Sequence, residues 1–130
     1  MLRRVPDSVE AHFQLGFASY LQHDYRGAVT WYRKATELKS DFTYAYHDLG
    51  HCLLQLGDRT GAIAAFGAAL RCQPDLSEAH RMLGELLWKE GRGSEAFLHA
   101  RLAVGCNPQD AAAKKLLQRL LAQITIPSAP

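Results

Sequence analysis

The sequence predicts an all-α protein built from repeated pairs of antiparallel helices. A Leu-Gly pair recurs three times with a period of 34 residues, at residues 15–16, 49–50 and 83–84. Between these pairs, apolar residues follow helical spacing and turn-forming residues interrupt them at regular places. A single helix pair cannot bury its own apolar face, so successive pairs have to stack into a solenoid.

The first expected repeat spans residues 9–42. The sequence LQHDY at residues 21–25 separates its two helices, and KSD at residues 39–41 ends the second helix. His23 occupies the turn position at which the later repeats have Gly57 and Gly91. We therefore expect two helices here, joined by a short turn.

The second and third expected repeats span residues 43–76 and 77–110. LGDRT at residues 56–60 and EGRGS at residues 90–94 divide each of them into two helices. Between repeats, Pro and Asp in KSD, QPD and NPQD end one helix, and we expect the Asp to cap the next.

The periodic glycine is expected to serve helix packing. Glycine inside a helix costs roughly 0.5–1 kcal/mol relative to alanine, so a gain in packing has to offset that cost. Twelve residues after each glycine the chain has an alanine, at Ala28, Ala62 and Ala96. We expect each glycine to lie opposite this alanine and to bring the two helices close together. A further column, Tyr32 and Phe66, changes to Ala100 in the third repeat.

The two ends of the chain differ from the repeats. Residues 111–124 carry one apolar stripe and predict a seventh, capping helix, and residues 125–130 form a tail. At the other end, residues 1–8 (MLRRVPDS) align with ALRCQPDL at residues 69–76. We therefore interpret residues 1–8 as the remnant of a preceding repeat in a longer protein. The uncapped N-terminal face would then be open to self-association.

Composition excludes several functional classes. The chain is 48% hydrophobic and its formal net charge is +2, which is too small for a nucleic-acid-binding surface. It has no apolar run long enough to span a membrane and no signal-peptide pattern. We expect a soluble, cytoplasmic protein that binds neither nucleic acid nor membranes.

No catalytic or cofactor motif is found in the sequence. Cys52, Cys72 and Cys106 have no paired or metal-ligand spacing, so we expect reduced thiols buried as small apolar residues. His47 and His51 have a spacing that can ligate a metal, with Glu85 as the candidate neighbour, but no third ligand is committed. We therefore expect no enzyme activity, no cofactor and no metal. Our main interpretation of the two histidines is that they line a binding surface.

The repeated columns resemble the tetratricopeptide repeat family, whose signature has Leu-Gly, spaced Ala, aromatic and Pro positions on a 34-residue period. The resemblance covers residues 9–108. His12, Tyr46 and His80 depart from it, because they replace the usual Trp of the first helix. The resemblance implies a right-handed superhelical solenoid with a concave groove, lined by the first helix of each repeat.

The resemblance also implies which side chains line the groove. A protein-interaction module would hold a peptide segment or a partner helix there, with aromatic anchors toward the N-terminal repeat and basic groups toward the C-terminal end. The implied residues are Phe13, Phe17, Tyr20, Tyr44, His47, His51, Arg81, Glu85, Trp88, Lys89, Lys115 and Arg119. The alternatives are that some of the aromatic residues pack between helices and that the basic residues form a solvated face.

The family's clamp for acidic chaperone tails needs Lys, Asn and Arg at five groove positions. Here those positions hold Phe13, Phe17, Asp48, Glu78 and Met82, so an adaptor for such tails is not expected. Two alternatives to a free-standing module remain. One is the docking region of a larger enzyme of the glycosyl- or sulfo-transferase type, and the other is a type III secretion-type chaperone.

Overall fold

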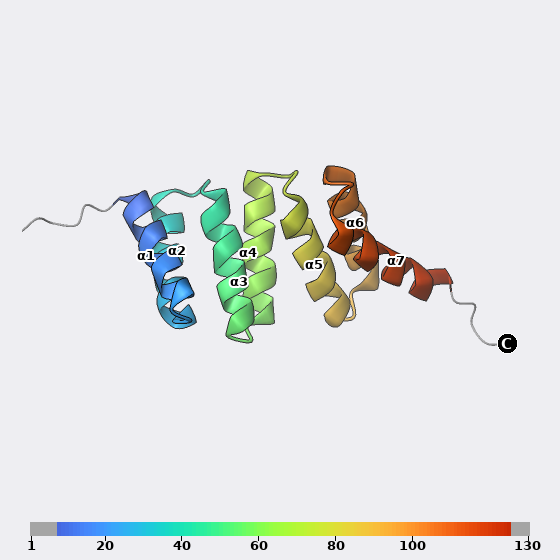
Figure 1. Ribbon diagram of the computed structural model, residues 1–130, viewed down its shortest axis with the longest axis horizontal. Coiled ribbons are helices and arrows are strands. Elements are labelled where there is room, and N and C mark those ends of the chain that lie inside the picture. Colours follow the sequence, from blue (N-terminus) through green and yellow to red (C-terminus); the bar gives the residue numbers. More distant parts are fainter. Residues whose placement is uncertain (1–7, 126–130) are drawn as a thin grey trace, which may run out of the picture. The chain divides into compact units, whose positions relative to one another are not determined.

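The computed structural model describes residues 8–125, in which all regular structure is helical (Figure 1). The chain forms two compact units, Met1–Gln73 and Pro74–Pro130. The expected repeat remnant and the expected tail fall almost wholly on residues 1–7 and 126–130, outside the described residues. The seven helices within residues 8–125 agree with the predicted number.

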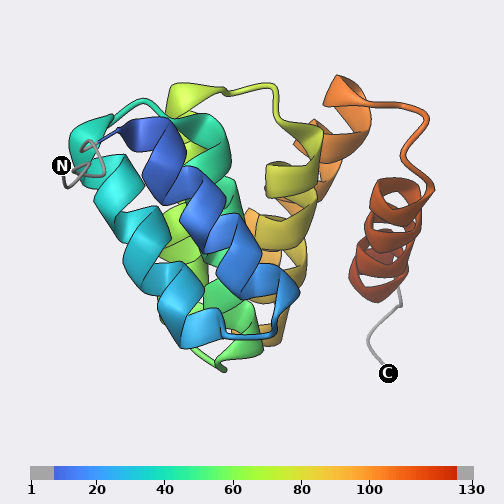
Figure 2. The same cartoon turned by 60° about the vertical axis from the view of Figure 1, so that its left-hand side comes forward.

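The first unit contains four helices. They are α1 (Val9–Leu21), α2 (Tyr25–Leu38), α3 (Thr43–Gln55) and α4 (Arg59–Cys72). Each packs against the next in the chain, and Figure 2 shows α1 and α2 side by side. The core of this unit contains Tyr32, Phe66 and Cys52, whose side chains are fully buried.

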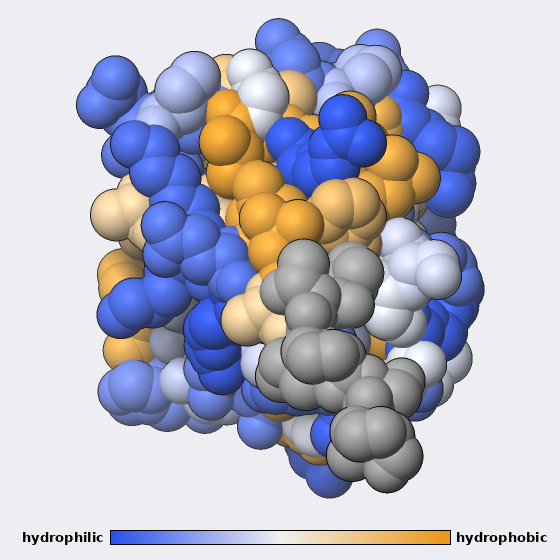
Figure 3. Space-filling model, turned by 90° about the vertical axis from the view of Figure 1, so that its right-hand side faces the viewer, coloured by the Kyte–Doolittle hydropathy of each residue, from blue (hydrophilic) through white to orange (hydrophobic). Residues whose placement is uncertain are grey.

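The second unit contains α5 (Ser77–Lys89), α6 (Gly93–Cys106) and α7 (Ala111–Thr125). Helices α5 and α6 form a pair, and α7 packs against both of them. Figure 3 views the molecule from the α7 side and shows apolar surface beside the last described residues. The exposed large apolar side chains of α6 and α7 are Leu98, Leu102 and Leu121.

Aspartate caps hold the second helix of the first two repeats. The carboxylate of Asp24 accepts a hydrogen bond from the Gly27 N–H at 3.0 Å, and Asp58 accepts one from Gly61 at 2.8 Å. A Cβ atom at either glycine would collide with the capping carboxylate, so glycine at this position leaves room for the cap. The third repeat begins its second helix after Arg92, without a side-chain cap.

The expected caps between repeats are found only before α7. The side chain of Asp110 accepts hydrogen bonds from the N–H groups of Ala112 and Ala113 at 3.0 and 3.2 Å. Helices α3 and α5 instead begin after Phe42 and Leu76, which make no side-chain cap bond. The prediction of aspartate caps at these two starts was therefore wrong.

At Gly16 and Gly50 the nearest group is an aromatic ring and not the expected alanine. A Cβ atom at Gly16 would lie 2.8 Å from the ring of Tyr32, and one at Gly50 would lie 2.8 Å from the ring of Phe66. Real Cβ contacts are not this short, so the glycine makes room for an aromatic ring from the second helix of the pair. Packing of that ring offsets the helix-propensity cost of glycine.

The third repeat has Ala100 where the first two have the ring, and a different residue fills the space. The nearest atom to a Cβ at Gly84 is Cδ2 of Leu116 in α7, at 2.9 Å, followed by backbone atoms of Ala96 and Ala100. Leu116 is buried. Helix α7 thus supplies from outside the pair the apolar group that the third repeat lacks.

The turns inside the three repeats share one backbone conformation. His23 has φ of +61°, and Gly57 and Gly91 have φ of +80° and +78°. Positive φ strains a residue with a side chain, which explains why glycine stands in two of the three turns. His23 is held by a 2.8 Å hydrogen bond between its Nδ1 and the hydroxyl of Tyr25.

The cysteines are all free, but they are not all buried. Cys52 is buried, Cys72 is half-buried and Cys106 is exposed, so the expectation of burial was wrong for Cys106. Cys106 is the last residue of α6. Burial, together with the charge of Asp48, raises the pKa of Cys52 to about 12.

Of the described helices, none has both the length and the apolar character that crossing a membrane needs. The cytoplasmic location stays a prediction.

Candidate functional site: an aromatic pocket in the first unit

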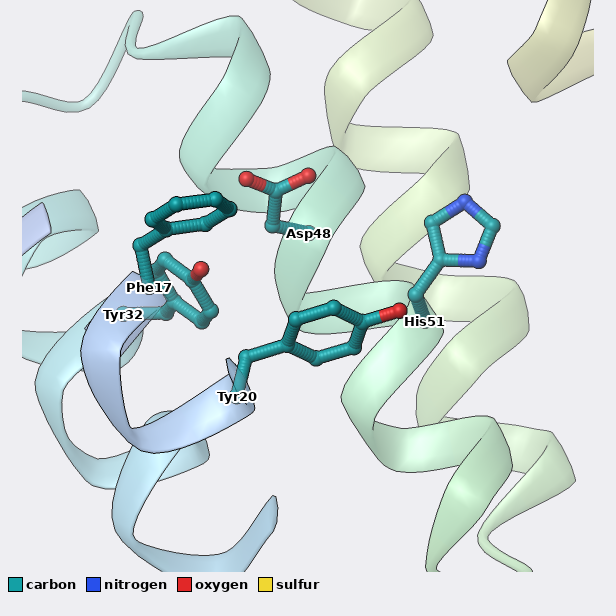
Figure 4. A pocket seen from close by; sticks show the side chains of 5 residues that line it. All are labelled: Phe17, Tyr20, Tyr32, Asp48 and His51. Atoms are coloured by element: carbon teal, nitrogen blue, oxygen red, sulfur yellow. The ribbon is translucent and has the colours of Figure 1, made fainter. Parts of the chain in front are cut away.

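A pocket opens among the first three helices of the first unit, with a volume of about 90 Å³ (Figure 4). Helix α1 contributes two aromatic rings to it, α2 contributes one, and α3 contributes a carboxylate and an imidazole. The lining residues are Phe17, Tyr20, Tyr32, Asp48 and His51.

Tyr32 forms the inner wall of the pocket. Its side chain is 1% exposed, and its ring lies against Gly16 of α1. Burial raises the pKa of the Tyr32 hydroxyl, and the nearby carboxylate of Asp48 raises it further. The hydroxyl therefore stays protonated and neutral at physiological pH.

Phe17 and Tyr20 form the outer aromatic wall. They are three residues apart on α1, so their side chains lie on one face of that helix. Phe17 is 47% exposed, whereas Tyr20 is half-buried and meets the ring of Tyr25 edge-on at a centroid distance of 5.7 Å. Contact with Tyr25 fixes the position of Tyr20 at the rim.

Asp48 and His51 form the polar side of the pocket and are likewise three residues apart, on α3. The Asp48 side chain is 32% exposed, and its Oδ1 lies 3.6 Å from Nδ1 of His47. The ring of His51 meets Phe66 edge-on at 5.2 Å. Figure 4 shows the hydroxyl end of Tyr20 directed toward His51.

The other groove residues expected in the first unit do not line this pocket. The ring of Phe13 lies 5.5 Å from that of Tyr32 and 4.9 Å from that of Phe42, which is the inter-helix packing named above as the alternative. His47 is buried behind His51, with ring centroids 4.7 Å apart. Tyr44 is exposed at the start of α3.

In the second unit, carboxylates of the same unit surround Arg81. Its guanidinium nitrogens lie 3.8 Å from Glu78, 3.5 Å from Glu85 and 3.6 Å from Asp110. These groups balance the Arg81 charge. The role of Arg81 and Glu85 in binding a partner stays a prediction.

The remaining predicted residues of the second unit lie on α5 and α7. The Trp88 indole N–H donates a hydrogen bond to Gln123 at 3.0 Å, and the guanidinium carbon of Arg119 lies 4.9 Å from the Trp88 ring centroid. Lys89 and Lys115 are exposed. A cation of the chain itself thus already covers the ring of Trp88.

Two residues of the pocket were not among the predicted site residues. Tyr32 belongs to the repeated aromatic column, which reads as core from sequence alone. Asp48 was considered only as an obstacle to binding carboxylates. Its spacing of three from His51, on the face expected to line the groove, was the signal that could have identified it.

Comparisons with known families match both parts of the chain. One tetratricopeptide repeat model matches residues 47–111, and a second matches residues 9–42. No match was found among curated protein sequences.

Solved structures of low sequence identity share the fold. The tetratricopeptide domain of OM64 from Arabidopsis is 24% identical, with a TM-score of 0.80 over 86% of this chain and 93% of that one. The Yersinia enterocolitica type III secretion chaperone SycD, solved with a peptide of the translocator YopD, is 18% identical, with a TM-score of 0.82 over 91% and 95%.

A third structure, the first tetratricopeptide domain of Spaghetti (RPAP3) bound to the HSP90 peptide SRMEEVD, is 14% identical, with a TM-score of 0.82 over 89% of this chain and 92% of that one. At these identities the likeness shows the fold alone. It confirms the predicted fold class, an all-α solenoid of antiparallel helix pairs.

Proposed function

The chain belongs to the tetratricopeptide repeat family, and from that premise we propose that it binds a peptide segment or a helix of a partner protein on the face formed by α1 and α3. The observation that carries the proposal is the pocket between these helices, where an exposed aromatic ring adjoins a carboxylate. Aromatic side chains in pockets dominate the energy of protein interfaces. The same proposal gives the chain no catalytic role.

Phe17 and Tyr20 are the anchors of this proposed surface. About half of the Phe17 side chain is exposed at the edge of the pocket. A partner group that enters the pocket would therefore bury this ring. In the second unit, Lys89, Lys115 and Arg119 stay predicted binding residues, whereas carboxylates of that unit balance the charge of Arg81.

The test is selection of peptides from a displayed random library on the purified chain, followed by affinity measurement for the enriched peptides. We expect Phe17→Ala to weaken the selected peptides by at least about tenfold, as hot-spot truncations do. Leu38→Ala is the matched control, because Leu38 has the same 47% exposure but lies on α2 outside the pocket. The helical content of both variants is checked by circular dichroism.

If the selected peptides bind the Phe17→Ala variant as tightly as the original chain, the proposal that this surface binds the partner is refuted. Whether the module acts alone, as a docking region of a larger enzyme, or as a secretion-type chaperone stays a prediction.

A further inference from the structure

The pocket of the first unit has the composition of a cation-binding site. We propose that the aromatic rings of Phe17, Tyr20 and Tyr32 and the carboxylate of Asp48 receive the ammonium group of a lysine side chain from the partner. This inference rests on the proposed function, since it names the chemistry of the group that the pocket binds.

The aromatic walls supply the first attraction. The faces of aromatic rings carry partial negative charge and attract a cation placed within about 6 Å of the ring centre. Among the described residues, the cations that lie over rings are found elsewhere, as the pairs Lys39 with Phe42, Arg101 with Phe97, and Arg119 with Trp88. In contrast to Trp88 in the second unit, the rings of the pocket have no cation from residues 8–125 over them.

The carboxylate supplies the second attraction. Within the described part of the chain, the one charged or chargeable group at ion-pair distance from Asp48 is His47, at 3.6 Å; no lysine or arginine is that close. The negative charge of Asp48 reaches into the core, where it raises the pKa values of both Tyr32 and Cys52. Its carboxylate is also partly exposed, so a partner's ammonium group can reach it.

The pocket is small, so it can receive only the end of a side chain. Pockets for small-molecule ligands have volumes of roughly 300–1,000 Å³, well above the 90 Å³ found here. The slender four-carbon stem of lysine carries its charge at the tip, where it can pass Phe17 at the rim and bring the ammonium group to Asp48. Its three N–H donors can serve the carboxylate and the tyrosine hydroxyl oxygens together.

The test titrates four small probes into the whole chain and follows the backbone amide signals of Gly16, Asp48 and His51 by NMR. The probes are the N-acetyl amides of lysine, norleucine, ε-trimethyllysine and arginine. Norleucine keeps the aliphatic stem but lacks the charge. We work at about pH 8, where histidine side chains are ordinarily neutral, and at low salt, so that screening is weak.

We expect saturable shifts with the lysine probe and affinity at least about tenfold weaker for norleucine. Asp48→Asn should reduce the affinity for the lysine probe by about tenfold without changing that for norleucine. Asp41→Asn is the matched control, because it removes the same charge from an exposed loop of the same unit and should leave both affinities unchanged. Leu38→Ala should likewise have no effect.

Equal affinity of the lysine and norleucine probes would overturn the inference and leave an apolar anchor site, with the proposed function intact. Tighter binding of the trimethyllysine or arginine probe than of the lysine probe would overturn the choice of a primary ammonium group. Unchanged lysine affinity in Asp48→Asn would remove the role of the carboxylate. Failure of the proposed function itself is seen separately, as peptide binding that Phe17→Ala does not weaken.

Discussion

At the scale of single residues, the ring of Phe66 decides what fits at residue 50. We predict that Gly50→Ala lowers the free energy of unfolding by about 1–3 kcal/mol, although alanine is the better helix former. The added Cβ would lie 2.8 Å from the ring, and a buried ring in a close-packed core has little room to move. Urea denaturation followed by circular dichroism measures the change.

The matched control is Gly67→Ala in α4. Its Cβ would meet nothing nearer than the end of the Arg71 side chain at 3.9 Å, so the variant should be more stable by about 0.5–1 kcal/mol. Equal changes in both variants would show that helix propensity, and not the contact with Phe66, sets the requirement at Gly50.

The sequence located these glycines but did not identify the side chain nearest to them. The alanine and aromatic columns repeat with the same 34-residue period, so spacing cannot tell which of them lies opposite Gly16 or Gly50. That depends on the rotation of the second helix about its own axis, which is set by side-chain packing. The change from Phe66 to Ala100 could be seen in the sequence, but its replacement by Leu116 could not.

At the scale of helices, Leu116 is one of three buried side chains of α7, with Ala113 and Leu120. We predict that Leu116→Ala lowers the stability of the second unit by about 2–5 kcal/mol, because it opens a cavity beside Gly84 where no aromatic ring can compensate. Hydrogen exchange of the α7 amides, measured by NMR, should rise by the corresponding factor.

Leu121→Ala on the same helix serves as the control, since Leu121 is 40% exposed and should cost less than about 1 kcal/mol. Protection of α7 that survives Leu116→Ala would show that its other contacts suffice to hold it.

A hydrogen bond between two histidines, His80 and His99, joins α5 to α6. His80 Nε2 lies 2.8 Å from the carbonyl oxygen of Pro74, so it must carry a hydrogen and donate it. His80 Nδ1 is then the acceptor at 3.1 Å from Nδ1 of His99, which donates. Burial lowers the pKa of His99, and the charge that His80 can carry lowers it further, although Glu95 opposes the shift.

We therefore predict that the second unit loses stability on acidification. Below about pH 6.5 the unfolded chain binds a proton at His99 that the folded chain binds only at lower pH. The contribution of His99 to the free energy of unfolding is therefore fully present above this pH and is lost as the pH drops below it. The melting temperature of the original chain should fall more between about pH 7.5 and about pH 5.5 than that of His99→Gln. The same fall in both proteins would assign the acid sensitivity to other groups.

The positions of the helices were more predictable than their starts. Turn residues interrupt the helical spacing clearly, and aspartate capped α2 and α4 through Asp24 and Asp58. The starts of α3 and α5 lack such a cap although an aspartate precedes each by two residues. A cap depends on the backbone angles of the residue itself, which local sequence determines only weakly.

At the scale of the whole molecule, the sequence indicated a binding surface better than it indicated the surface's chemistry. The family resemblance implied Phe17, Tyr20 and His51 as groove residues, and they meet in one pocket. Asp48 and Tyr32 were missed. Asp48 was considered only as a negative charge that repels a carboxylate ligand, and Tyr32 was assigned to the core. Around Arg81, the spacing of Glu78 and Glu85 on the same helix could have indicated two of the three carboxylates. The third, Asp110, comes close only when segments distant in sequence pack together.

Similarity of fold does not carry the ligand with it. The Spaghetti domain shares this fold and was solved with SRMEEVD, a peptide with two adjacent glutamates and a C-terminal aspartate. We predict that the present chain does not bind SRMEEVD at up to about 1 mM, because Asp48 places negative charge beside the pocket and Arg81 is already balanced by Glu78, Glu85 and Asp110. Fluorescence anisotropy of the labelled peptide measures this, with the Spaghetti domain as the positive control. Micromolar binding to this chain would mean that its exposed lysines and Arg119 outweigh the acidic pocket, and that the chain selects acidic partners after all.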